Sequence, residues 1–92
     1  MKTGKTIVKE FIKNNGLDFS GSGSDLNGNC VILAGFICHV SDGIYDDAVS
    51  LIEGIKLSTE ANIELTRVFE FAFANDYELF WKTPEAKEKY KF

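Results

Sequence analysis

The chain has 92 residues, of which 45% are hydrophobic and 13% aromatic, and its formal net charge is −4. These values are typical of one small globular domain, residues 1–92, and exclude a disordered chain. The longest apolar run is far shorter than the roughly 20 residues that a membrane-spanning helix needs, and no secretory signal pattern is visible. We therefore expect a soluble, cytoplasmic protein with no membrane association.

Charge is distributed unevenly along the sequence. Both ends are basic, with a net charge of +3 over residues 1–13 and +2 over residues 82–92. The middle, residues 14–81, has eleven acidic residues against two basic ones, so its net charge is −9. An acidic body of this kind attracts basic partners and disfavours direct binding of nucleic acid.

The first predicted element is an amphipathic helix over residues 3–15. Apolar residues recur at helical spacing on one side, at Ile7, Val8, Phe11 and Ile12. Gly16 follows as a residue suited to the left-handed conformation at which helices commonly end, and Leu17 can fold back onto the last turn. This is the clearest helix boundary in the sequence.

A long uncharged run, Cys30–Val40, is expected to form the interior of the fold. It is rich in β-branched residues and has turn sequences before it at Asn27-Gly28 and after it at Asp42-Gly43, a pattern that favours a buried β-strand. Cys30 and Cys38 would lie roughly 26 Å apart on such a strand, at about 3.3 Å per residue. That separation excludes a disulfide between them.

The Asn27-Gly28 dipeptide predicts a β-hairpin that pairs this strand with residues 17–26. Pairing outward from the turn would set Phe19 opposite Phe36 and Ser22 opposite Leu33. Glycine and serine weaken the first strand, so Ser20–Asp25 is expected to be a loose or irregular edge.

Two helices are predicted to follow. Residues 44–55 carry apolar side chains at helical spacing, with Asp46 and Asp47 near the positive end of the helix dipole. A short third strand at Ile44 and Tyr45 is the alternative. Ser58 or Thr59 is the expected N-cap of the longest helix, which extends to Asn75. The apolar side of that helix consists of Ala61, Leu65, Val68, Phe69, Ala72 and Phe73.

Beyond Asn75 the sequence predicts an aromatic cluster and a last helix. Thr83, Pro84 and Glu85 have the order of an N-cap and a first turn, and the helix would end near Lys91. The predicted fold class is therefore α+β: an N-terminal helix, an antiparallel β-hairpin with an optional third strand, and two or three helices packed on the sheet.

No catalytic, metal or cofactor motif is visible. His39 is the sole histidine, and on a strand its side chain would point away from that of its neighbour Cys38. Zinc sites need about four converging ligands, which Cys30, Cys38 and His39 cannot supply from one strand. The Gly21–Ser24 run is not followed directly by a helix start in the predicted fold, as a phosphate-binding loop requires. We expect a protein that is not an enzyme and holds no cofactor.

The acidic residues of the body suggest a function as a group. Their profile resembles that of small phage proteins that disarm restriction nucleases or CRISPR complexes, and of immunity proteins that block nuclease toxins. This resemblance implies an inhibitor that mimics DNA and occupies the basic surface of a nuclease or nucleic-acid-binding complex. The predicted contact set is Asp42, Asp46, Asp47, Glu53, Glu60, Glu64 and Glu70.

Two other function classes fit the sequence. A structural module could form a homodimer by adding a strand to the exposed edge of the hairpin. A protein that sequesters a small molecule could use a pocket lined by aromatic side chains, namely Phe71, Phe73, Tyr77, Phe80 and Trp81.

Overall fold

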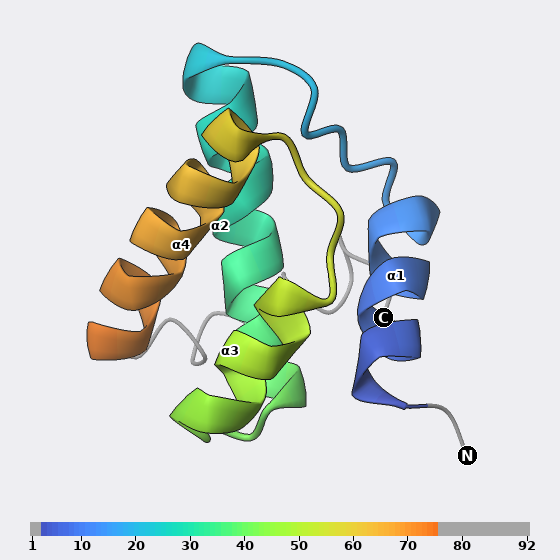
Figure 1. Cartoon of the computed structure of the whole chain (residues 1–92), viewed down its shortest axis with the longest axis vertical. Helices are drawn as coiled ribbons and strands as arrows, with labels where there is room; N and C mark the ends of the chain where they lie inside the picture. The colour runs from blue at the N-terminus through green and yellow to red at the C-terminus, as the bar shows by residue number, and fades with distance from the viewer. Residues whose placement is uncertain (1–2, 76–92) are drawn as a thin grey trace.

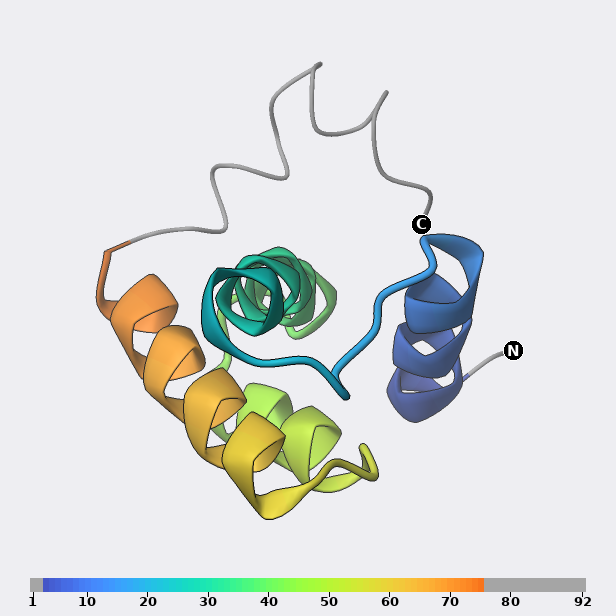
Figure 2. The same ribbon diagram turned by 90° about the horizontal axis from the view of Figure 1, so that it is seen from above.

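A computed structural model describes residues 3–75, which form four α-helices. These are α1 (Gly4–Asn14), α2 (Gly23–Val40), α3 (Tyr45–Glu53) and α4 (Thr59–Ala74). Figure 1 shows α2 in the middle of the molecule, and Figure 2, looking along it, shows α4, α3 and α1 arranged around it. Residues 3–75 contain no β-strand, so the predicted α+β fold is wrong and this part of the chain is entirely helical.

Helix α1 confirms the predicted N-terminal helix at both ends. The Thr3 hydroxyl accepts a hydrogen bond from the Thr6 amide at 3.2 Å, as an N-cap does. Gly16 has a left-handed φ of 60°. The Leu17 amide donates to the Ile12 carbonyl and the Gly16 amide to the Lys13 carbonyl, the paired bonds of a Schellman motif. Val8 and Phe11 are buried.

The predicted strand Cys30–Val40 is instead the C-terminal part of helix α2. Six consecutive residues, 33–38, are all buried. Successive helical residues point about 100° apart, so such a run is buried only when the rest of the chain covers the helix on every side. A helix without a solvent face has no polar stripe, and its sequence shows the unbroken apolar run that also characterises a buried strand.

The predicted hairpin pairing is wrong for the same reason. Asn27-Gly28 lies inside α2 and makes no turn. Phe36 does not face Phe19 across a sheet; its ring stacks on Phe11 of α1, with centroids 3.8 Å apart and planes 5° from parallel. At about 1.5 Å per helical residue, Cys30 and Cys38 are roughly 12 Å apart along the axis, less than predicted but still too far for a disulfide. Both side chains are buried, and the two do not form a disulfide.

The segment predicted to be irregular, Ser20–Asp25, is divided between two conformations. Residues 20–22 belong to the connection, where the Asp18 carboxylate accepts hydrogen bonds from the amide and hydroxyl of Ser20. Residues 23–25 form the first turn of α2. Asp18 and Ser20 thus close an Asx-type turn that leads into the central helix.

The two later helices confirm the prediction, without the optional third strand. Ile44 is extended but serves as the N-cap of α3, and Tyr45 is helical. Ser58 is the N-cap of α4, because its hydroxyl accepts from the Ala61 amide at 3.1 Å. The apolar side of α4 was predicted correctly: five of its six members are buried and the last, Phe73, is partly buried. The last helix and the aromatic cluster predicted after Asn75 lie outside the described residues.

Helices α3 and α4 each pack on α2, and the α2–α4 contact is the most extensive in the fold. Small side chains allow that close approach: Ala34 of α2 and Ala61 and Ala72 of α4 are each completely buried. Among residues 3–75, no helix is long and apolar enough to cross a bilayer. The arrangement places α3 and α4 side by side on α2, with less contact between them than each makes with α2.

Candidate functional site: an acidic groove between α3 and α4

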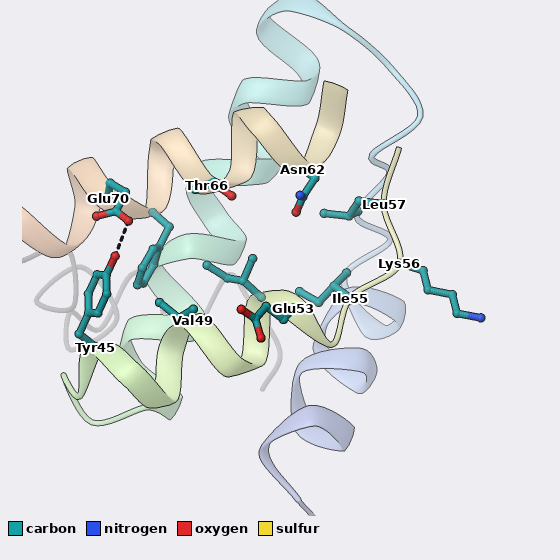
Figure 3. A pocket seen from close by; sticks show the side chains of 11 residues that line it. Tyr45, Val49, Glu53, Ile55, Lys56, Leu57, Asn62, Thr66 and Glu70 are labelled. Carbon is teal, nitrogen blue, oxygen red and sulfur yellow. Dashed lines mark hydrogen bonds between the residues drawn. The ribbon is translucent and has the colours of Figure 1, made fainter. Parts of the chain in front are cut away.

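A groove of about 600 Å³ lies between α3 and α4 (Figure 3). Residues one helical turn apart form each wall: Tyr45, Val49 and Glu53 on α3, and Asn62, Thr66 and Glu70 on α4. Ile52 and Phe69, both buried, form its floor, and the connection between the helices adds Ile55, Lys56 and Leu57. The groove therefore has an apolar base and polar groups along its rim.

One end of the groove is closed by an aromatic cluster. Tyr45 of α3 lies with its ring centroid 5.7 Å from that of Phe69 and 5.2 Å from that of Phe73, both on α4. The Phe69 and Phe73 rings are 5.6 Å apart. Tilted and edge-on aromatic contacts of this kind stabilise the junction of the two helices. The groove opens away from this cluster, toward the connection between α3 and α4.

Two residues of the predicted contact set, Glu53 and Glu70, line the groove. The Tyr45 hydroxyl donates a hydrogen bond to Oε1 of Glu70 and so holds that carboxylate at the rim (Figure 3). This hydrogen bond and the negative charge of the carboxylate raise the pKa of Tyr45, because both disfavour the phenolate. Asp46 is exposed and does not line the groove. It is seven residues before Glu53 on α3, two turns away, and therefore projects from the same side of that helix.

Three other members of the contact set are exposed and do not line the groove. Asp42 lies in the turn between α2 and α3, with a left-handed φ of 55° that aspartate tolerates better than most residues. Asp47 is in the first turn of α3, as predicted, where its negative charge interacts favourably with the helix dipole. Glu60 is in the first turn of α4.

Glu64 differs from the other acidic residues because it is bound by its neighbours. Its carboxylate accepts from the Asn27 amide of α2 at 2.9 Å and forms a two-point pair with Arg67, at 2.9 and 2.8 Å. These hydrogen bonds, that from Arg67 first, lower the pKa of Glu64 to about 2. Glu64 thus lies at the α2–α4 contact, and the structure does not bring it to the groove.

Tyr45, Asn62 and Thr66 line the groove, although none of them was predicted as a site residue from the sequence. A signal for the last two was present, because Asn62, Thr66 and Glu70 are each four residues apart and form a polar row beside the predicted apolar side of α4. Only the placement of α3 beside that row shows that the row lines a groove.

The other candidate residues do not assemble into a site. Cys30 is completely buried, and burial, with a smaller contribution from Glu64, raises the pKa of its thiol to about 11. His39 is in the last turn of α2, with its ring 6.3 Å from that of Phe36. Within residues 3–75, no group of three histidine, cysteine or acidic side chains could hold a metal ion.

The aromatic residues predicted to line a pocket are not together in the described part of the chain. Phe73 packs in the cluster with Tyr45 and Phe69, whereas Phe71 borders a separate, smaller depression with Val31 and Arg67. Tyr77, Phe80 and Trp81 lie outside the described residues.

Comparison with known proteins identifies no relative: no family model, curated protein or solved structure matches this chain.

Proposed function

We propose that the protein is a non-enzymatic inhibitor that binds the basic surface of a partner protein through the acidic groove and the acidic residues around it. The observation that carries this proposal is that Glu53 of α3 and Glu70 of α4 line one groove, between two helices packed on α2. Asp46 lies on the same side of α3 as Glu53. Carboxylates held on rigid helices meet a fixed set of cations with little loss of conformational entropy.

The partner class follows from charge. A nuclease or another nucleic-acid-binding complex presents lysine and arginine side chains that neutralise phosphates. An acidic protein seated on that surface excludes nucleic acid from it, the mode of action of the anti-restriction and anti-CRISPR proteins whose profile this chain resembles. Asp42, Asp47 and Glu60 add to the long-range potential that accelerates association. Glu64 contributes least, since Arg67 already neutralises it.

A homodimer formed by adding a strand to a sheet edge is no longer supported. Strand addition needs an unpaired sheet edge, and residues 3–75 form only helices and their connections.

Charge reversal tests the proposal. The partner is first captured from a host lysate on the tagged protein and eluted in steps of rising salt. Association of the purified partner is then measured against Asp46→Lys/Asp47→Lys/Glu60→Lys. We expect slower association and a weaker salt dependence, because electrostatic steering acts on the association rate.

The matched control is Glu10→Lys/Asp18→Lys/Asp25→Lys. It makes the same change in net charge on α1, the following connection and the start of α2. Circular dichroism checks that both variants remain helical. If both triple variants slow association equally, only net charge matters and the proposed face is not the contact; if neither does, the electrostatic mechanism is wrong.

A further inference from the structure

We propose that the α3–α4 groove binds an arginine side chain of the partner, with the guanidinium at Glu70 and the alkyl stem on the apolar floor. This inference rests on the proposed function, because it specifies how a basic partner is recognised. It assigns the groove a task distinct from long-range attraction, namely the direct binding of one side chain.

The apolar base of the groove fits the stem of a long side chain. Ile52 and Phe69 lie at the bottom, and Val49, Ile55 and Leu57 are partly exposed along the sides. A long basic residue buries its methylene groups on such a surface while its charged end reaches polar groups. The volume, about 600 Å³, falls within the roughly 300–1,000 Å³ typical of ligand sites. It therefore also admits an apolar neighbour of the arginine.

The charge of the groove selects a cation. Glu53 and Glu70 are its two carboxylates, and Lys56 is the single cation among the lining residues that the structure describes. Figure 3 shows the Lys56 side chain extending away from the groove, whereas the Glu53 and Glu70 side chains lie along it. A phosphate or carboxylate ligand would be repelled. Nucleic acid is thereby excluded as the occupant, and a basic polypeptide is favoured.

The placement of Glu70 prepares it for a charged donor. The Tyr45 hydroxyl occupies Oε1 and limits the rotation of the side chain. Within residues 3–75, Oε2 accepts no hydrogen bond. A carboxylate already held in position loses less entropy on binding, which increases affinity.

Several acceptors favour arginine over lysine. The Thr66 hydroxyl lies one helical turn from Glu70 on the α4 wall, and the Tyr45 hydroxyl reaches Glu70 from α3. A guanidinium is planar and carries five N–H donors in fixed directions, so it can donate to the Glu70 carboxylate and to a neighbouring oxygen at once. An ammonium group is a compact, strongly hydrated charge that gains less from such an arrangement.

The test uses the full chain and the capped peptide acetyl-Leu-Arg-Leu-amide, followed by ¹H–¹⁵N NMR. We expect shift changes concentrated at residues 45–57 and 62–70. The same peptide with citrulline, the uncharged analogue of arginine, should bind about tenfold more weakly or worse, because a hydrogen bond to a charged group contributes roughly 1.5–3 kcal/mol. The affinity of the corresponding lysine peptide should lie between those of the arginine and citrulline peptides.

Two pairs of variants locate the site. Glu70→Gln should weaken binding of the arginine peptide several-fold, whereas Asp25→Asn, which removes the same charge on α2 outside the groove and the contact set, should not. Asn62→Phe should fill the groove and abolish binding. Ile63→Phe places the same ring on the neighbouring residue, which is 64% exposed and does not line the groove, and should leave binding intact.

The outcomes separate this inference from the proposed function. Equal binding of the arginine and citrulline peptides, or no shift change in the groove up to the solubility limit, would overturn the inference. Agmatine binding as tightly as the peptide would overturn the assignment to a polypeptide. If Asn62→Phe leaves association with the captured partner unchanged while charge reversal slows it, the groove inference fails and the proposed function stands. If the peptide binds at the groove but charge reversal does not change association with the partner, the groove inference stands and the electrostatic mechanism of the proposed function fails.

Discussion

The two sides of α4 differ in how they meet the neighbouring helix. Toward α2, alanines allow the most extensive helix contact in the fold, and Ala61, Leu65 and Ala72 are completely buried. Toward α3, a polar row faces a groove that closes only at the aromatic cluster around Tyr45. One side of the helix therefore supplies stability, whereas the other leaves polar groups accessible for binding.

The largest expected effect is on stability, on the α2 side. Leu65→Ala removes a completely buried side chain and should lower the free energy of unfolding by about 2–5 kcal/mol. The matched change on the groove side, Val49→Ala, should cost less than about 1 kcal/mol, because Val49 is partly exposed and alanine favours helix. Urea unfolding monitored by circular dichroism measures both. Similar losses would mean that the groove side is packed as tightly as the core.

Thiol reactivity compares the accessibility of the two sides directly. Burial and a pKa of about 11 should keep Cys30 nearly inert to a thiol reagent at pH about 8, since a free thiol has a pKa of about 8.5. A cysteine introduced at Asn62 in the groove should react at least about 100-fold faster than the wild-type cysteines, Cys30 and Cys38, both of which are buried. The reagent is added to folded protein, and unfolding in urea provides the rate for full exposure. Rapid modification of the wild-type protein would show that the α2 side opens readily.

The same comparison explains which elements the sequence could predict. Helices α1, α3 and α4 each keep a solvent face, so polar and apolar residues alternate at helical spacing and the helix is visible. Local signals fixed their ends as well: Gly16 ends α1, and Ser58 begins α4. These signals depend only on residues close in sequence, which makes them independent of the remainder of the fold.

Helix α2 could not be recognised in this way. Its periodicity is absent because residues 33–38 are buried in every direction, and that burial depends on the other helices. The Asn27-Gly28 signal was misleading, because both residues fit a helix once tertiary contacts stabilise it. Asn27 even has a role there, since its side chain donates to Glu64 of α4.

The acidic residues of the candidate site could be predicted from the sequence, but the groove that two of them line could not. The sequence identified Glu53 and Glu70 as exposed acidic residues, and the structure places both at the groove. It also grouped Glu64 with them, because nothing in the sequence shows that Asn27 and Arg67 bind that carboxylate. Which acidic residues share a surface depends on the packing of α3 and α4 around α2, and only the structure gives that packing.

A smaller effect is expected at the start of α4, where the groove opens. Ser58→Ala removes the hydroxyl that accepts from the Ala61 amide and should lower the free energy of unfolding by about 1 kcal/mol. Thr59→Ala, one residue later, should be neutral or slightly stabilising, because Thr59 is the first helical residue and alanine has the higher helix propensity. Equilibrium unfolding of the two variants measures the difference. Equal stability would show that the cap contributes nothing in this protein.

The smallest expected effect is a pH dependence on the α2 side, from the pair of partly buried Glu64 and exposed Arg67. The pKa of Glu64 is lowered to about 2 in the folded protein by Arg67 and Asn27, from about 4.5 without them. A depressed folded-state pKa stabilises the fold above the unfolded-state value, and this contribution is lost as pH falls from about 4.5 to about 2. The melting temperature of wild type should therefore exceed that of Glu64→Gln near neutral pH, and the gap should narrow as pH decreases through this range.

Arg67→Gln should reduce the same pH dependence, because it removes the cation but leaves the bond from Asn27. A gap that stays constant from about pH 6 to about pH 2 would mean that the pair does not distinguish the folded from the unfolded chain, so that packing alone joins α2 to α4.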